Sequence, residues 1–174
     1  AAGQPPILRM DGKGPLLLLQ ERPLVAETPE HLLDEAVTSY GNFFVRNNGL
    51  IPDAAPNPAA WKLTIDGEVN GALELTLGEL ERRFPLVTRQ LQMECGGNGR
   101  ASFAPQTRGN QWGNGAIGCA EYTGVRLADV LRAAGVKESA RSMNGQPLPH
   151  IHGGPVRLLV PGWPGSLSQK WLTR

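Results

Sequence analysis

Apolar and polar residues alternate with a period of two in several parts of the chain. Residues 61–65 (WKLTI) and 73–76 (LELT) show this alternation, which is typical of strands with one buried face. An Asp-Gly pair at 66–67 and an Asn-Gly pair at 70–71 stand between them, and both pairs are typical of hairpin turns. Residues 87–94 (VTRQLQME) form a longer segment of the same type. The pattern therefore predicts a hairpin followed by a third strand.

Other stretches change to helical spacing. Thr76 and Glu79 have the spacing of a capping box, and the apolar residues behind them would share one helix face: Leu77, Leu80 and Phe84. Residues 123–136 (TGVRLADVLRAAGV) give the clearest helical pattern, with a glycine as its stop. A third, short helix could begin with Thr28 as N-cap and Pro29 at the first helical position.

The order of these elements favours an α+β fold. Residues 153–163 (GGPVRLLVPGW) predict one more strand. Residues 1–30 look irregular, with an apolar patch at Leu16–Leu19 and an extended stretch at 21–30 (ERPLVAETPE). Strands and helices are mixed and joined by hairpins rather than by regular βαβ crossovers. A chain of 174 residues is long enough for one domain with a sizeable core.

Composition and charge exclude several classes of partner. The net charge of +1 gives no basic field for nucleic acid and no charged face for a membrane surface. No apolar run approaches the roughly 20 residues that span a bilayer. The 22 glycines and 15 prolines predict many tight turns and loops. No targeting segment is visible, and the opening AAGQPP would suit either a mature protein or a trimmed chain.

A cysteine stands where the 87–94 strand should end. Cys95 opens the run Gly-Gly-Asn-Gly-Arg, in which glycines would let backbone N–H groups approach a ligand closely. Arg100 could stabilise a thiolate at Cys95 or bind an anion. The alternative is an inert, buried thiol beside a turn, which is the usual state of a free cysteine.

Cysteine and histidine counts leave two further alternatives open. Cys95 and Cys119 could form one disulfide bridge, or join His150 and His152 around zinc. The close CxxC or HxxxH spacing typical of zinc sites is missing, however. The sequence has no CxxCH motif, so no haem is expected in this chain, and the glycine run matches neither a dinucleotide nor a P-loop fingerprint.

A third candidate is an arginine inside an apolar run. Arg46 lies between Phe43–Val45 and two asparagines. In an ordinary strand this arginine would be a solvated surface residue. Its apolar neighbours favour a partly buried site instead, where a guanidinium usually binds an anion.

Together these pieces resemble the sulfite oxidase-type molybdopterin enzymes, and among them the bacterial haem-free periplasmic sulfite dehydrogenases. Six segments occur in the order of that family: FFVRNN, WKLTIDGEV, ECGGNGR, QWGNGAIGCAEYTGVRLADVL, MNGQPLPHIHGGPVRLLVPGW and SLSQKWL. Each segment alone is a weak match, but six matching segments in the same order are specific for the family. The resemblance implies an α+β fold with mixed β-sheets, short helices and a molybdenum–molybdopterin cofactor.

The resemblance also assigns residues. Cys95 is the implied metal ligand, since a soft thiolate suits molybdenum. Cys95, Arg46 and Arg100 are the implied catalytic residues, and the two arginines would make a cationic pocket for a small anion. The implied cofactor-binding residues are Phe44, Val45, Arg46, Asn47, Asn48, Cys95, His152, Arg157, Ser168, Gln169 and Lys170.

The implied activity is oxidation of sulfite to sulfate by oxygen-atom transfer, with the hard chemistry supplied by the cofactor. Electrons would pass to a separate c-type cytochrome in the periplasm, and a C-terminal domain would form a homodimer. A sulfane dehydrogenase of a sulfur-oxidation complex is the alternative within the family. A truncated cofactor-binding domain without catalysis is the alternative outside it. Nitrate reductases share the domain but combine it with haem and flavin domains.

Two substitutions and two absences depart from the family pattern. Asn48 replaces the usual histidine, and Gly99 replaces the first arginine of a pair, so that Arg100 remains alone. Residues 1–174 are expected to be one molybdopterin-binding catalytic domain that is incomplete. Several dozen residues of the family are missing near 140/141, and the sequence stops before the family's catalytic tyrosine and dimerisation domain.

Overall fold

The computed structural model describes residues 5–53, 57–66, 71–134, 139–143, 145–154, 157–159 and 168–171. The chain divides into two compact units, each combining distant stretches of sequence. Unit 1 is built mainly from Ala1–Pro52 and Leu91–Ala120, and unit 2 from Asp53–Gln90, Glu121–Trp163 and Leu167–Arg174. The prediction of a single catalytic domain over 1–174 stays a prediction.

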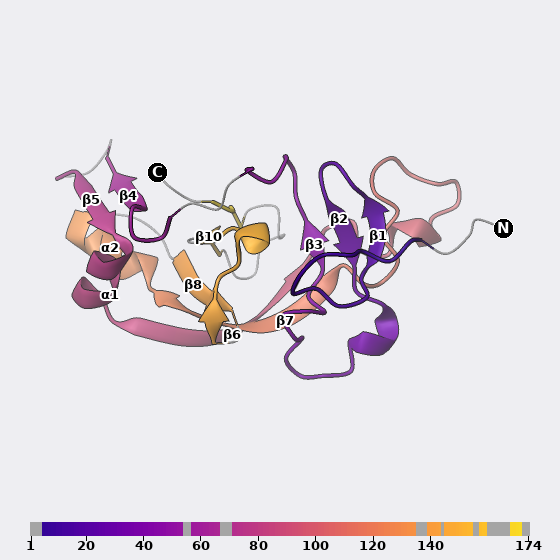
Figure 1. Ribbon diagram of the computed structural model, residues 1–174, viewed down its shortest axis with the longest axis horizontal. Coiled ribbons are helices and arrows are strands. Elements are labelled where there is room, and N and C mark those ends of the chain that lie inside the picture. Colours follow the sequence, from indigo (N-terminus) through magenta and orange to yellow (C-terminus); the bar gives the residue numbers. More distant parts are fainter. Residues whose placement is uncertain are drawn as a thin grey trace. The chain divides into compact units, whose positions relative to one another are not determined.

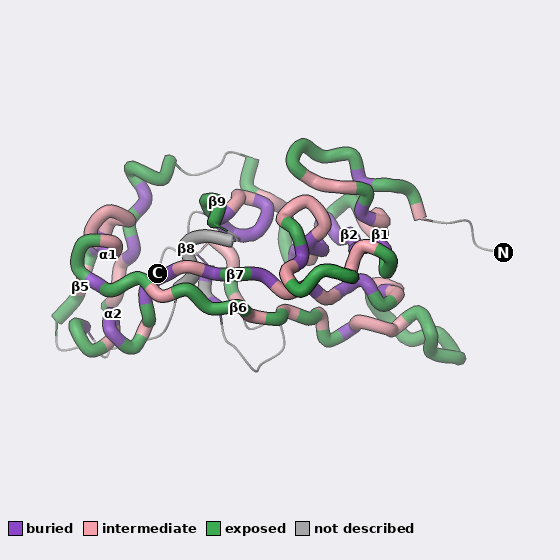
Figure 2. Tube along the Cα trace, turned by 90° about the horizontal axis from the view of Figure 1, so that it is seen from below, coloured by how far each residue is buried: buried purple, intermediate pink, exposed green. Residues whose placement is uncertain are grey.

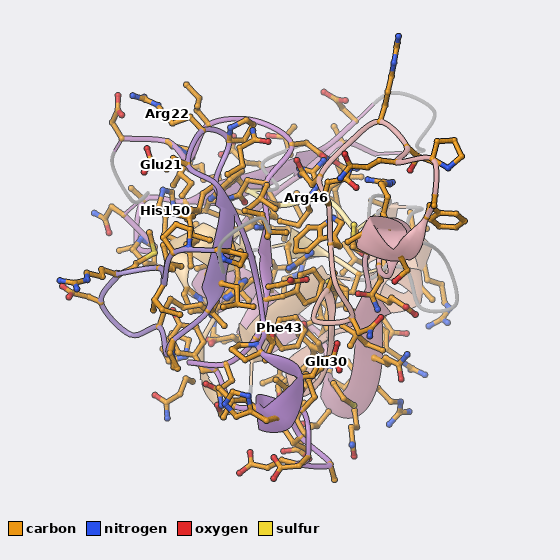
Figure 3. All side chains as sticks on the ribbon, turned by 90° about the vertical axis from the view of Figure 1, so that its right-hand side faces the viewer. Glu21, Arg22, Glu30, Phe43, Arg46 and His150 are labelled. Atoms are coloured by element: carbon orange, nitrogen blue, oxygen red, sulfur yellow. The ribbon has the colours of Figure 1, made fainter. Side chains whose placement is uncertain are left out.

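Unit 1 contains a three-stranded antiparallel sheet in the order β1–β2–β3 (Figure 1). Its strands are β1 (Leu17–Gln20), β2 (Val25–Glu27) and β3 (Val45–Arg46). The expectation of an irregular N-terminal stretch was therefore wrong. Every residue of β2 is buried, so this strand lacks the alternation by which a half-exposed strand is found. At the turn between β1 and β2, Glu21 and Arg22 point outward (Figure 3).

Three aromatic rings form part of the core of unit 1. Phe43 and Phe44 stack with their ring centroids 5.4 Å apart, and Phe44 meets Trp112 edge to face at 6.0 Å. Such offset and perpendicular pairs are the preferred aromatic geometries. A Cβ at Gly118 would lie 2.8 Å from the Phe43 ring, so the glycine lets the ring pack against the backbone.

Lys13 ties the N-terminal stretch to the turn that precedes β3. Its Nζ donates hydrogen bonds to the carbonyl oxygens of Tyr40 and Phe43, both at 2.8 Å, and lies 4.9 Å from the centroid of the Tyr40 ring. The Gly14 N–H also donates to Gly41 O at 3.0 Å. Burial lowers the pKa of Lys13 from its ordinary value of 10.5 to about 7.

Unit 2 contains the predicted hairpin. Strands β4 (Lys62–Ile65) and β5 (Leu73–Thr76) pair antiparallel, with Leu63 opposite Leu75. Residues 67–70 of the two predicted turns lie outside the described residues. Helices α1 (Leu77–Arg83) and α2 (Leu127–Ala134) lie beside the hairpin (Figure 1). The buried apolar residues of this core come from both helices and both strands: Trp61, Leu63, Leu75, Leu80, Phe84, Val125 and Val130.

The predicted start of α1 is confirmed. The Glu79 N–H donates to Thr76 Oγ1 at 3.2 Å, and the Thr76 N–H donates to Glu79 Oε2 at 2.8 Å, which completes the capping box. Helix α2 begins four residues later than its pattern suggested. Residues 123–125 belong to a strand instead, because they pair with a neighbouring strand.

The helix predicted from Thr28 is wrong. Only one 3₁₀ turn, η1 (Glu30–Leu32), forms there, and no side chain caps it. The Thr28 hydroxyl instead donates to Asn42 O at 2.6 Å. A tertiary hydrogen bond has therefore replaced the expected local cap.

A third sheet has the order β10–β8–β7–β6, with β9 paired to β8. Its strands are β6 (Leu86–Glu94), β7 (Ile117–Val125), β8 (Ser139–Met143), β9 (Gln146–Pro147) and β10 (Arg157–Leu158). β6 and β7 contribute residues to both units. β6 is largely exposed, whereas buried residues recur along β7 (Figure 2).

The sheets confirm the α+β class. Each strand pair with a described register is antiparallel. The strand predicted over 153–163 is present as β10, and residues 155–156 and 160–163 lie outside the described part of the chain. Among the described residues, no helix has the length and apolar character needed to cross a bilayer.

The pKa of Lys13 predicts a pH-dependent contribution to stability. Between pH 7 and 10.5 the unfolded chain holds a proton at this lysine that the folded chain has released, so stability due to Lys13 rises with pH in this window. The difference in unfolding free energy between the wild type and Lys13→Met should therefore grow by at least about 1 kcal/mol from about pH 7 to about pH 9.5.

Denaturant unfolding at the two pH values measures this difference. Lys62→Met is the matched control, because Lys62 is exposed and its hydrogen bond with Glu74 raises its pKa. The control difference should not grow over the same range. A Lys13 difference that stays constant would contradict the assignment.

Candidate functional site

The cysteine loop, residues 95–101, begins directly after β6. The Cys95 thiol is free and half-buried, so the bridge to Cys119 that the sequence left open does not form. The Asn98 N–H donates to Cys95 O at 2.9 Å and closes the first turn of the loop. Cys119 is also half-buried rather than fully buried, and its backbone N–H and C=O both bond to Thr38.

A second segment, residues 112–116, holds the cysteine loop in place and is called the bridging segment below. The N–H groups of Cys95 and Gly99 donate to Ala116 O at 2.9 Å and Gly113 O at 2.6 Å. The Ala101 N–H donates to Trp112 O at 2.9 Å. In return, the Ala116 N–H donates to Asn98 Oδ1 at 2.9 Å. Four hydrogen bonds therefore fix the loop that carries the thiol.

The glycines of the cysteine loop have different tasks. Gly99 has φ +76°, a left-handed conformation that favours glycine and precedes the 3₁₀ turn η2 (Arg100–Ser102). A Cβ at Gly97 or Gly109 would come within 2.7 or 2.5 Å of the Arg100 guanidinium, whose Nη1 donates to Asn110 O at 3.2 Å. Gly96 differs from Gly97, Gly99 and Gly109, because a Cβ built at Gly96 would meet no atom within 4 Å.

The glycines of this run were expected to let a ligand approach the backbone, and the structure changes that interpretation. Gly97 leaves space for the Arg100 side chain rather than for a ligand. Gly109, which lies outside the run, also leaves space for Arg100. Gly96, next to the thiol, is the position where backbone stays open to an incoming group.

Arg46 lies at the end of β3, opposite Val25 of β2. It is half-buried, as predicted, and its Nη1 donates to the carbonyl of Asn47. Figure 3 labels it together with Phe43, which precedes it by three residues. Phe44, Val45 and Asn47 are buried, whereas Asn48 is exposed. The first three therefore support the arginine from the core, and their cofactor-binding role stays a prediction.

Trp112 connects the arginine segment with the cysteine loop. Its ring meets the edge of Phe44, two residues before Arg46, and its carbonyl accepts the Ala101 N–H, one residue after Arg100. The structure therefore brings both predicted cationic segments to the bridging segment within unit 1. Sequence reasoning did not single out Trp112. A tryptophan inside a Gly- and Asn-rich run was the available signal in the sequence. In the structure its ring is fully buried.

Unit 2 carries a second group of predicted residues, the cationic cluster, on the 3₁₀ turn η3 (His150–His152), Arg157 and residues 168–171. Arg157 donates from Nη1 to His152 O at 3.1 Å and from Nη2 to Ser168 O at 3.3 Å. Lys170 Nζ donates to Ile151 O at 2.8 Å. Arg157 thus joins His152 and Ser168, and Lys170 bonds to the neighbour of His152. Gln169, the fifth residue predicted here, is exposed.

The electrostatics of the cationic cluster favour an anion. Arg157 is only 4% exposed, and burial lowers the pKa of its guanidinium, with the nearby Tyr122 acting in the opposite direction. None of residues 145–154, 157–159 or 168–171 is acidic. Gly153, at φ +96°, approaches Lys170 so closely that a Cβ would lie 2.7 Å from its Cα.

The side chains fit a metal-bearing, phosphate-bearing cofactor. In unit 1 a free, half-buried thiol offers a soft ligand for a metal. Unit 2, described by itself, offers a buried guanidinium and an ammonium as donors for an anion. Across the residues described, no three His, Cys, Asp or Glu side chains gather into a metal-binding group. The zinc alternative with Cys95, Cys119 and two histidines therefore finds no ligand set there.

Comparison with known proteins is decisive for the family. The sequence profile of the oxidoreductase molybdopterin binding domain matches residues 48–142 and 140–174. This chain belongs to the sulfite oxidase-type molybdopterin enzymes. The cofactor of the family is molybdenum–molybdopterin, in agreement with the thiol and the buried cations described above.

The relatives of this molybdopterin domain differ in their activities. Sulfite oxidase of Gallus gallus is 33% identical over 99% of this chain and 45% of its own length. Nitrate reductase [NAD(P)H] of Hordeum vulgare is 30% identical over 98% of this chain and 23% of its own length. The crystal structure of the sulfane dehydrogenase SoxCD from Paracoccus pantotrophus superimposes with a TM-score of 0.74 at 30% identity, covering 87% of this chain and 46% of that one. The chain thus spans less than half the length of these proteins.

The cationic cluster predicts a variant that loses cofactor without losing the fold. In Arg157→Met a side chain of similar length replaces the buried guanidinium, so the metal-free protein should unfold at a similar temperature. Molybdenum bound per chain should fall by about tenfold, because a charge-assisted hydrogen bond to the anion is lost.

Metal analysis and thermal unfolding of the same preparations measure the two effects. Arg89→Met, at an exposed position of β6, is the matched control and should retain its molybdenum. Equal metal content in both variants would contradict an anion-binding role for Arg157.

Proposed function

We propose that this chain is the molybdopterin-binding part of an enzyme that oxidises sulfite to sulfate by oxygen-atom transfer. One observation carries the proposal: in unit 1 the free Cys95 thiol, Arg100 and the Arg46 segment are all held by one bridging segment. A soft metal ligand and two guanidiniums on one support suit a small, doubly charged anion that reacts at a metal.

Each residue of the proposed site has a separate task. Cys95 would supply the protein ligand to molybdenum. The family resemblance assigns Arg157 and Lys170 to an anionic group of the pterin. When bound, the cofactor supplies two-electron oxygen-atom transfer. Arg46 and Arg100 would bind and orient the substrate anion and favour the charge that develops on it. Asn48 offers an amide where a histidine would titrate, so it can donate a hydrogen bond at any pH.

The electron acceptor is proposed from the resemblance to bacterial haem-free enzymes. We propose that a separate c-type cytochrome receives the electrons, as the resemblance to the bacterial haem-free sulfite dehydrogenases implies. The same resemblance supports a periplasmic location and a homodimer.

A sulfane dehydrogenase activity is the second candidate. The structural match to the sulfane dehydrogenase SoxCD favours this activity. The sequence identity to SoxCD, 30%, is close to the 33% identity to the sulfite oxidase of Gallus gallus. Carrier-bound sulfur is bulkier than sulfite, so the two activities separate in an assay with small substrates.

The ligand role of Cys95 predicts a loss of turnover. Cys95→Ser keeps a side chain of similar size, and the backbone bonds of the cysteine loop do not involve the thiol. Sulfite oxidation should fall by at least about 100-fold, since even partners of metal ligands contribute 10- to 100-fold. The unfolding midpoint of the metal-free protein should change little.

A steady-state assay of the full-length, molybdenum-loaded protein with cytochrome c measures this loss and also tests the proposed function. Sulfite should be turned over and thiosulfate should not. No turnover of sulfite in a preparation with one molybdenum per chain would overturn the proposal, as would full activity of Cys95→Ser.

The position of Arg100 predicts a change in substrate affinity. Arg100→Gln removes the guanidinium, and Gly97→Ala displaces it by placing a methyl group 2.7 Å from Cζ. Both variants should raise KM for sulfite, by about tenfold or more for Arg100→Gln, because a charged hydrogen bond is lost. Arg46→Gln should act in the same direction.

Gly71→Ala is the matched control. A Cβ at Gly71 meets nothing within 4 Å and Gly71 has no role in the proposed site, so KM for sulfite should not change. Equal KM values for Gly97→Ala, Arg100→Gln and the wild type would remove the role of Arg100 in substrate binding.

A further inference from the structure

Glu27 is a buried carboxylate that the proposed mechanism does not use. It ends β2 and is 6% exposed. Its Oε2 accepts the Gly113 N–H at 2.8 Å, and the Gly115 N–H also bonds to the carboxylate. A Cβ at Gly113 would lie 3.1 Å from Oε1. The carboxylate therefore occupies a small concavity of backbone N–H groups, which is an arrangement that binds anions.

Neighbours of Glu27 hold the same segment. The Thr28 N–H donates to Gly115 O at 3.1 Å, and a Cβ at Gly115 would come within 1.9 Å of Thr28 O. Asn114 Nδ2 donates to Glu30 Oε1 at 2.8 Å. Residues 27–30 consequently fix the backbone of the bridging segment from its Gly113 to its Gly115.

Gly113 transmits this fixation to the cysteine loop. Its N–H donates to Glu27, and its carbonyl accepts the Gly99 N–H at 2.6 Å. Three residues further along the same bridging segment, Ala116 O accepts the Cys95 N–H. The bridging segment therefore bonds Glu27 through the Gly113 N–H and the cysteine loop through its carbonyl groups.

We propose that Glu27 is a positioning residue that sets the orientation of the Cys95 loop through the bridging segment. The consequence for the metal rests on the proposed function, whereas the backbone geometry stands without it.

The carboxylate is present despite an electrostatic cost. Burial raises the pKa of Glu27, the hydrogen bonds from Gly113 and Gly115 lower it, and the charge of Glu30 raises it. An apolar side chain would be buried at lower cost but could accept neither N–H group. Acceptor oxygen held against both N–H groups is what the carboxylate contributes.

Amide hydrogen exchange tests the proposal on the protein purified without molybdenum. In Glu27→Ala the amides of Gly99 and Ala101 should exchange about tenfold faster or more, because the bridging segment loses a buried acceptor. The Gly14 amide, bonded to Gly41 O in the same unit, should keep its rate. Glu35→Ala, at an exposed position of unit 1, is the matched control and should leave all three rates unchanged.

Glu27→Gln provides the conservative variant and covers the case in which the alanine variant does not fold. Its carbonyl oxygen can accept one N–H, while its NH₂ group faces the other, so the increase in exchange should be smaller than for alanine. In the molybdenum-loaded protein, the thiolate-to-metal charge-transfer absorption should shift in Glu27→Ala and return toward the wild type in Glu27→Gln.

Three results would overturn the positioning role. They are unchanged exchange at Gly99 and Ala101 in both variants, an equal increase at Gly14, and an unshifted absorption band in the loaded alanine variant. Failure of the proposed function gives a different pattern: exchange at the cysteine loop responds to Glu27, but the wild type does not oxidise sulfite.

Discussion

The backbone hydrogen bonds of residues 112–116 are the constraint on which the candidate site of unit 1 depends. This segment accepts or donates hydrogen bonds at each end of the cysteine loop and lies against Phe44 of the arginine segment. Backbone bonds suit this task because their geometry tolerates little rotation, whereas a side-chain contact could shift with a rotamer. A thiol that must meet a metal at a fixed distance gains from such support.

Glycines in unit 1 are therefore concentrated where backbone meets backbone or a large side chain. Gly115 lies against Thr28, Gly118 against the Phe43 ring, and Gly97 against Arg100. The cationic cluster of unit 2 follows the same principle, with Gly153 against Lys170 and carbonyl oxygens of η3 as acceptors for Arg157 and Lys170. In both units close packing at glycines fixes the loops. Backbone carbonyl oxygens accept hydrogen bonds from the charged ends of the arginine and lysine side chains.

Local signals predicted the elements that depend on local interactions. The capping box at Thr76, the hairpin strands and the core of α2 follow from nearest neighbours along the chain, and the structure confirms them. Thr28 and β2 were misjudged because their partners, Asn42 and β3, are distant in sequence. The site residues came from an ordered set of motifs, which indicates which residues act but not what holds them. Glu27 and Trp112 carry that information, and their roles follow from partners that are distant in sequence.

The long reach of the Glu27–Gly113 hydrogen bond has a consequence for the order of events in the cell. The two residues are 86 positions apart, and the Cys95 N–H bonds to Ala116 O, which also lies in a later stretch of the sequence. Contacts between distant residues form late, since the loop they close must first lose its freedom. The thiol therefore reaches its final orientation only when unit 1 is nearly complete. A cofactor that needs this orientation must then be inserted into an already folded chain, rather than serve as the nucleus around which the chain folds.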